Sequence, residues 1–318
     1  MNEDLRRQVA ALTGRGDHKG LFSLAYELLQ AGEVPAAEEV ARAAQDAGSA
    51  EILPLLAITL DSQGRTAEAE TVYRQAIAAG DDSSLIQLAD MLLGDESRRD
   101  EAEELARRAA GRGVITAQYV LGKILARQPG REAEAEAALL AEAEPSIRPM
   151  VQLELGQLLR RRPGREADAE RALRDSGLPE AQFILAGLLR KRPGREEEAV
   201  EALWRAAESG VRGAWNNLTA TLKELGQMDR ADAAYRDGLN RGATELLPYY
   251  GDFLRLQGRP AEAEQVLRAG LPADPKCALV LGSMLLADPA RVDEARELLI
   301  QAAGTGVVQA AITLAQPR

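Results

Sequence analysis

The sequence of 318 residues predicts an all-α fold in which about nine helix-turn-helix repeats stack into a solenoid. Three observations support this prediction: a small residue recurs at a nearly constant spacing, each interval contains two apolar stripes of helical periodicity, and glycines stand where the helices end. The recurring residue is an alanine followed about four residues later by an apolar residue. Successive alanines lie 30 to 34 residues apart, at Ala37, Ala69, Ala102, Ala135, Ala169, Ala199, Ala231, Ala263 and Ala295.

The first half of each repeat predicts a helix with one apolar stripe. A leucine precedes a small residue, and another leucine follows three or four residues later, as in Leu24–Leu28 and Leu121–Leu125. This spacing places the leucines on one side of a helix. The small residue between them is expected where a neighbouring helix approaches closely.

The second half of each repeat is rich in Ala and Glu, which favour helix, as in Glu101–Ala106. In six repeats a glycine follows the repeat alanine by eleven residues, and a glycine just past a helix can adopt the left-handed conformation that ends it. In three repeats a Pro-Gly pair followed by acidic residues separates the two helices. The six glycines are Gly48, Gly80, Gly113, Gly210, Gly242 and Gly306, and the Pro-Gly pairs are 129–130, 163–164 and 193–194.

Repeat five departs from the regular spacing. Only 30 residues separate Ala169 from Ala199, and Pro145 and Pro149 stand where a glycine link is expected before this repeat. We expect a shortened second helix that ends near Ser176–Gly177, followed by a bend in the array.

No change in composition divides the chain, so we expect one domain over residues 1–318. Residues 1–18 are predicted to form a capping helix and a loop, residues 19–308 the nine repeats, and residues 309–318 a partial C-terminal helix. In that last helix Ile312 and Leu314 are apolar. The helix either caps the array or docks on a second copy of the chain to form a homodimer.

The chain resembles the tetratricopeptide repeat family over nearly all of its length. One repeat carries Trp215, Leu218 and Leu222 with Ala231 and Tyr235, and the next carries Gly251, Leu254, Ala263, Gly270 and Pro275. Residues 206–210 with Ala214 also resemble Sel-like repeats, whereas Thr219 stands where the family has a smaller residue. The resemblance implies a right-handed superhelix whose first helices line the concave surface. It also implies a scaffold that binds a peptide segment or a partner protein.

Composition opposes several classes of function. The net charge of −11 and the isoelectric point near 4.9 disfavour general attraction to nucleic acid or to anionic membranes. The N-terminus, MNEDLRRQ, lacks the apolar core of a secretory signal, and the apolar stretch 277–287 is too short to cross a bilayer. With a single cysteine, Cys277, the chain cannot form an intramolecular disulfide, and we expect a cytoplasmic protein.

The residues that usually carry catalysis do not form a recognisable pattern. His18 is the only histidine and lies in a polar stretch expected to be a loop, and Asp81–Asp82 read as helix-capping residues. Acidic pairs such as Glu68 and Glu70 recur at the repeat spacing, which predicts a solvated helix face rather than an acid–base pair. We therefore expect no enzyme, no cofactor and no metal site.

One surface stands out as a candidate binding site. On the predicted first helices of repeats four to seven, the positions that point away from the leucine stripe carry cations, asparagines and aromatic residues. One interpretation is a groove for a peptide, including an acidic one; the other is complementation of helix-end charge. A helical-repeat nucleic-acid binder is the rival function, and a helical-repeat enzyme comes third. The candidate residues are Tyr119, Lys123, Arg127, Gln157, Arg160, Arg161, Phe183, Arg190, Lys191, Asn216, Asn217 and Lys223.

Overall fold

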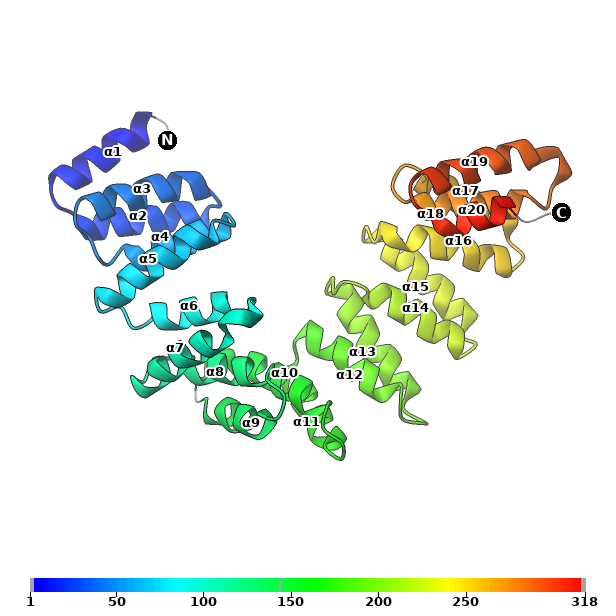
Figure 1. Ribbon diagram of the computed structural model, residues 1–318. Coiled ribbons are helices and arrows are strands. Elements are labelled where there is room, and N and C mark those ends of the chain that lie inside the picture. Colours follow the sequence, from blue (N-terminus) through cyan, green and yellow to red (C-terminus); the bar gives the residue numbers. More distant parts are fainter. Residues whose placement is uncertain (1–2, 143, 316–318) are drawn as a thin grey trace. The chain divides into compact units, whose positions relative to one another are not determined.

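The computed structural model describes residues 3–142 and 144–315. These residues form twenty α-helices and four short 3-10 helices, with no strand among them (Figure 1). The prediction of an all-α fold is confirmed. Contacts between Cα atoms group the chain into two compact units, residues 1–176 and residues 177–318.

Unit 1 contains eleven α-helices within its described residues. Helix α1 comes first, and five hairpins follow, each made of two consecutive helices that pack against each other. The helices are α1 (Glu3–Gly14), α2 (His18–Gln30), α3 (Val34–Asp46), α4 (Leu53–Ser62), α5 (Thr66–Ala78), α6 (Ser84–Leu92), α7 (Arg99–Gly111), α8 (Ala117–Leu125), α9 (Glu132–Ala141), α10 (Arg148–Leu159) and α11 (Glu166–Ser176), with 3-10 turns at Glu96–Arg98 and Pro145–Ile147.

Unit 2 contains four further hairpins and a last helix within its described residues. With the five of unit 1 they make the nine repeats that the alanine spacing predicts. The helices are α12 (Pro179–Leu189), α13 (Glu196–Glu208), α14 (Ala214–Glu224), α15 (Met228–Asn240), α16 (Leu247–Leu256), α17 (Pro260–Gly270), α18 (Pro275–Leu285), α19 (Val292–Gly304) and α20 (Val308–Ala315), with 3-10 turns at Thr244–Leu246 and Pro289–Arg291.

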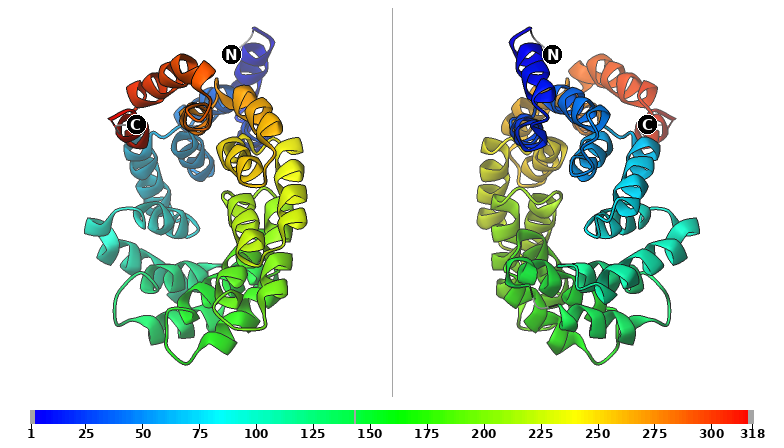
Figure 2. Two further views of the ribbon diagram at one scale, coloured as in Figure 1. Left: turned by 90° about the vertical axis from the view of Figure 1, so that its right-hand side faces the viewer. Right: turned by 90° about the vertical axis from the view of Figure 1, so that its left-hand side faces the viewer.

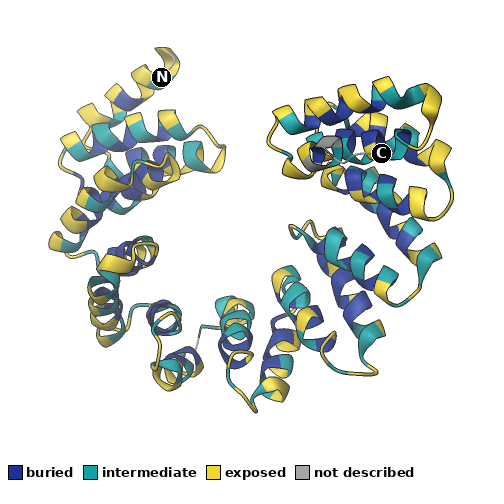
Figure 3. Cartoon of the chain, turned by 45° about the vertical axis from the view of Figure 1, so that its right-hand side comes forward, coloured by how far each residue is buried: buried dark blue, intermediate teal, exposed yellow. Residues whose placement is uncertain are grey.

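Within each unit, successive hairpins lie side by side in chain order (Figure 2). Buried residues line the interior between the helices, and exposed residues face outward (Figure 3). In unit 1 a single cluster of buried side chains runs from Val9 to Ala172. Each hairpin therefore buries its apolar surface against its neighbours, as repeat arrays do.

The small residue of the first helix lies where the two helices of a hairpin meet. Gly156 of α10 shows the reason for its size: a Cβ atom there would lie 2.5 Å from Cγ of Leu173 in α11. Gly122 stands in the same relation to Leu139 one hairpin earlier. The close approach predicted from the leucine-small-leucine pattern is confirmed at both positions.

The second helices end as the sequence predicts. The six glycines that follow the repeat alanines have φ angles between +70° and +97°, a conformation that favours glycine. In repeat five, α11 spans 11 residues and ends at Ser176, two residues shorter than α3, α5 and α7. The boundary between the two units falls at the same place.

The structure bears on two expectations about the ends of the chain. The loop predicted around His18 is wrong at its last residues, because α2 begins at His18 and the Asp17 carboxylate caps it by accepting a hydrogen bond from the Gly20 N–H. At the other end, α20 covers Val308–Ala315, while the side chains of Ile312 and Leu314 and residues 316–318 lie outside the described residues. That one continuous domain spans residues 1–318 stays a prediction.

Candidate partner-binding surface

The outward side of the first helices in unit 1 forms a surface that we call the first-helix face. Each of these helices contributes to the face the residue that directly follows its small packing residue. The Nζ atom of Lys123 in α8 lies 2.5 Å from Oδ1 of Asp90 in α6, so this position is adjacent in successive helices. Along α2, α4, α6, α8 and α10 the position is occupied by Tyr26, Ile58, Asp90, Lys123 and Gln157.

Glu154 of α10 is a half-buried acid on this face, and the sequence analysis did not single it out. Burial raises the pKa of its carboxyl, Asp90 adds to the rise, and Lys123, Arg127 and Arg161 oppose it. Within the described residues its carboxylate forms neither an ion pair nor a hydrogen bond with another side chain. An acid in this state is available to a hydrogen-bond donor from outside the chain.

Tyr119 brings an aromatic ring to the same group. Its ring centroid lies 5.3 Å from Nζ of Lys123, within the range of a cation–π interaction. Burial, and then the charges of Glu154 and Asp90, raise the pKa of Tyr119 to about 12. The structure thus brings Tyr119 and Lys123, both predicted from the sequence, together around an acid that was not.

Three arginines border this group, at the ends of two successive first helices. Arg127 follows α8, and Arg160 and Arg161 follow α10; all three are exposed. Nε of Arg161 donates to the Gln157 carbonyl at 3.2 Å, and in the described part of the chain none of the three forms an ion pair. Their positions agree with complementation of helix-end charge, and their guanidinium groups remain open to a ligand.

The predicted residues of unit 2 are engaged to different degrees. Nη2 of Arg190 lies 2.7 Å from a Glu224 carboxylate oxygen, so this cation already has a partner. The Asn217 amide donates to the Gly213 carbonyl at 2.9 Å within its own helix. Lys223 lies 5.8 Å from the Tyr235 ring centroid. Phe183 and Asn216 are half-buried, and Lys191 is exposed.

The second helices carry a ladder of ion pairs that the sequence analysis missed. Arg98 shows one rung: Nη1 lies 2.6 Å from Glu70 of the preceding second helix, and Nη2 lies 2.6 Å from Glu101 of its own hairpin. Each such arginine precedes the repeat alanine by four residues and joins two consecutive hairpins. Further examples are Arg65, Arg131, Arg165, Arg259 and Arg291.

The ladder corrects the prediction that the recurring acids form a solvated face. The inner acid of each pair, one residue after the repeat alanine, is partly buried: the side chain of Glu70 is 23% exposed, against 52% for Glu68. Hydrogen bonds from Arg98 and Arg74 outweigh the effect of burial and lower the pKa of Glu70 to about 2. The spacing of Arg, Ala and Glu around the repeat alanine was the signal that could have revealed this arrangement.

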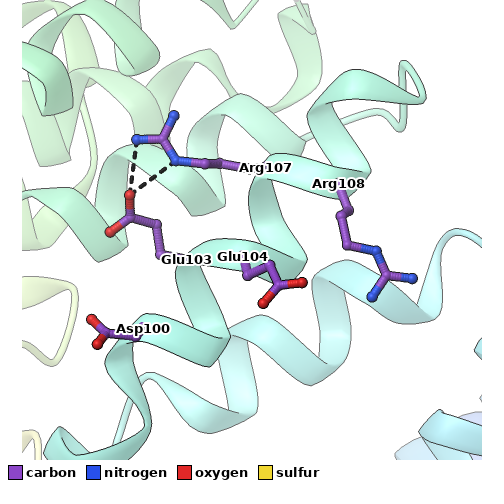
Figure 4. Close-up of a pocket in the computed structure, with 5 residues that line it drawn as sticks. All are labelled: Asp100, Glu103, Glu104, Arg107 and Arg108. Carbon is purple, nitrogen blue, oxygen red and sulfur yellow. Dashed lines mark hydrogen bonds and ion pairs between the residues drawn. The ribbon is translucent and has the colours of Figure 1, made fainter.

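A hollow on the outer surface of α7 belongs to this ladder. Figure 4 shows Glu103 and Arg107 paired across one turn, with Nε of Arg107 2.9 Å from the carboxylate. Asp100, Glu104 and Arg108 complete the lining of the hollow. Glu103 is partly buried and held by Arg107, whereas Asp100 and Glu104 are exposed, so the hollow is a part of the ion-pair ladder that opens to the surface.

The remaining candidates for chemistry have structural explanations. Cys277 is buried at the start of α18, and burial raises the pKa of its thiol to about 11, which opposes a reactive thiolate. Asp81 caps α6 by accepting a hydrogen bond from the Ser84 N–H at 2.9 Å. Among the described residues, no cluster of His, Cys, Asp or Glu could hold a metal ion. None of the helices in residues 3–142 and 144–315 is long and apolar enough to span a membrane.

A comparison with family models identifies repeats in two stretches of the chain. The family model described as tetratricopeptide repeat matches residues 9–84 and 221–276. A search of curated proteins finds no match. Among solved structures, the tetratricopeptide repeat domain of P58(IPK) is similar at 15% identity and a TM-score of 0.28, with 95% of this chain and 100% of that chain covered.

Proposed function

The chain belongs to the tetratricopeptide repeat family, whose repeats mediate protein–protein interaction, and from that premise we propose that it is a non-catalytic scaffold for a peptide segment of a partner protein. The binding surface in this proposal is the first-helix face, which corresponds to the concave surface of the family. A single cysteine cannot form an intramolecular disulfide, which fits a reducing compartment, and we propose that the protein is cytoplasmic.

The observation that carries the proposal is the contrast between two sets of arginines. Directly before the second helices, arginines such as Arg98 and Arg131 are held by carboxylates of the chain itself. On the first-helix face, Arg127, Arg160 and Arg161 are exposed and form no ion pair among the described residues. Carboxylates of a partner can therefore form charge-assisted hydrogen bonds with them, which favours an acidic segment.

The neighbouring groups suit a peptide chain. A peptide backbone offers both N–H donors and carbonyl acceptors, which match the free Glu154 carboxylate and the arginines on either side of it. Tyr119 supplies a half-buried aromatic surface of the kind that anchors a partner side chain. In unit 2, Phe183, Asn216 and Lys191 offer a comparable set on α12, α14 and the turn after α12.

Nucleic-acid binding is the second candidate, favoured by the same three arginines. A phosphate backbone in contact with them would also approach the carboxylates of Asp90 and Glu154, which repel it. The isoelectric point near 4.9 adds a long-range repulsion. These two effects place the nucleic-acid function behind the peptide function.

Fluorescence anisotropy with two labelled probes, a polyglutamate peptide and single-stranded oligouridine RNA, tests the proposal on the full chain. The test variant is Arg127→Glu with Arg161→Glu. The matched control is Arg6→Glu with Arg108→Glu, which changes the net charge equally at exposed positions on α1 and α7. We expect the test variant to bind polyglutamate more weakly by about tenfold or more and the control to bind as the native chain does.

Two results would contradict the proposal. Equal losses in both variants would show that polyglutamate responds only to net charge. Tighter binding of oligouridine than of polyglutamate, lost in the test variant alone, would establish the nucleic-acid function instead. Titrations at low and high salt separate these cases, because nucleic-acid binding weakens steeply as salt rises.

A further inference from the structure

We infer that the first-helix face of unit 1 takes a segment of two parts, with apolar side chains over α2 and α4 and acidic side chains over α8 and α10. This inference rests on the proposed function and specifies its ligand. It follows from three features of the face: where its exposed apolar side chains lie, where its unpaired cations lie, and which charges stand between them.

The apolar part lies on the first two hairpins. Phe22 and Tyr26 of α2 are 37% and 48% exposed, and their rings stack with centroids 6.4 Å apart. Ile58 of α4 is 39% exposed, at the position that corresponds to Tyr26 in the next hairpin. The first-helix face thus exposes an aromatic pair on α2 and an aliphatic side chain at the corresponding position of α4, and exposed apolar side chains on successive helices suit a contact with apolar groups of a ligand.

The cationic part lies on the fourth and fifth hairpins. Arg127, Arg160 and Arg161 all extend from the C-terminal ends of first helices, and Lys123 lies one turn earlier on α8. Lys123 is paired with Asp90, so the three arginines supply the positive charge that a ligand would meet. The apolar and cationic parts therefore occupy different hairpins of one row.

Acids on the face keep the two parts distinct. Asp61, three residues after Ile58 in the last turn of α4, is exposed and would repel an acidic side chain over the apolar part. Asp90 holds Lys123 at the midpoint, and Glu154 lies beside the arginines. A uniformly acidic segment would meet Asp61 unfavourably, whereas a segment with its acids confined to one end would not.

The size of the face sets the length of the segment. Packed helices lie about 10 Å apart, so the five first helices from α2 to α10 span about 40 Å. An extended chain advances about 3.3 Å per residue, which gives a segment of about twelve residues. A partner that satisfies both parts is thus an extended stretch of this length with aromatic or aliphatic residues toward one end and Asp or Glu toward the other.

Selection from a displayed library of random peptides of about twelve residues tests the inference on the full chain. We expect the native protein to enrich peptides with apolar residues in one half and acidic residues in the other. The variant Tyr26→Ala with Ile58→Ala should lose the apolar half of this preference and keep the acidic half. The variant Arg127→Glu with Arg161→Glu should do the reverse.

The controls are Leu140→Ala, which removes an exposed apolar side chain from α9, and Arg6→Glu with Arg108→Glu. Both should enrich the same peptides as the native chain. Circular dichroism confirms that every variant is folded. Direct titration of one enriched peptide should show about tenfold weaker binding to each face variant.

The outcomes separate this inference from the proposed function. The two-part ligand would be overturned, with peptide binding left in place, if the enriched peptides were acidic throughout or apolar throughout. The same conclusion would follow if one variant removed the preference for both halves. Enrichment that none of the face variants alters would place binding elsewhere and overturn both proposals. The absence of any enriched peptide would also count against both.

Discussion

The two glycines Gly156 and Gly187, each on the first helix of its own hairpin, should respond in opposite directions to substitution by alanine. A Cβ atom at Gly156 would lie 2.5 Å from Cγ and 2.6 Å from Cδ2 of Leu173, whereas one at Gly187 would meet nothing within 4 Å. Overpacking in a core costs about 1–3 kcal/mol, and alanine in place of glycine in a helix gains about 0.5–1 kcal/mol. Gly156→Ala should therefore lower the free energy of unfolding by about 1–2 kcal/mol, and Gly187→Ala should raise it by about 0.5 kcal/mol.

Urea denaturation followed by far-ultraviolet circular dichroism measures both effects as shifts of the midpoint at an unchanged slope. A second background isolates the cause. Leu173→Ala removes the side chain that a Cβ at position 156 would strike, so in that background Gly156→Ala should be neutral or stabilising. A shift of the same sign for both glycines, or a penalty at Gly156 that persists without Leu173, would refute the packing argument.

Three further predictions concern charged and titratable groups. Arg98 lowers the pKa of Glu70 to about 2, and Arg291 does the same for Glu264. Both acids therefore contribute fully to the free energy of unfolding above about pH 5, and this contribution is lost as the pH falls toward 2. Urea midpoints measured against pH should show this fall. Arg98→Ala should lower the free energy of unfolding by about 1 kcal/mol at neutral pH and make its fall with pH smaller; a pH profile identical to that of the native chain would contradict the ladder. Glu154→Gln should raise the midpoint at neutral pH, because burial disfavours the charged form that it removes; a lower midpoint would show that the carboxylate is stabilised. Cys277 should resist iodoacetamide at pH 8 until urea unfolds the protein, and rapid labelling of the native chain would contradict its burial.

Features that depend on one helix and its own hairpin could be predicted from the sequence. The repeat alanines and the glycines at the ends of the second helices determine where helices lie and which side each one buries. Gly156 illustrates this, since its small size follows from the leucines around it and its contact with Leu173 lies within one hairpin. The end of α11 at Ser176 was also expected from the short spacing between Ala169 and Ala199.

Features that depend on contacts between hairpins could not be predicted in the same way. The partner of Arg98 is Glu70, 28 residues away, and the pairing requires the two second helices to be offset so that position −4 of one meets position +1 of the other. The pairing of Lys123 with Asp90 and the half-burial of Glu154 likewise depend on how one first helix lies against the next. Periodicity shows which side of a helix faces inward, but it does not show this offset.

The ladder on the second helices has a consequence for how such a chain can grow. The hairpin α6–α7 receives Arg131 from its successor on one edge and sends Arg98 to its predecessor on the other. Duplicating a whole hairpin leaves every donor matched to an acceptor. Inserting half of a hairpin would leave a guanidinium without its carboxylate on one side and a carboxylate without its guanidinium on the other. Gene duplication in complete repeats is therefore the change that this architecture tolerates without compensating mutations.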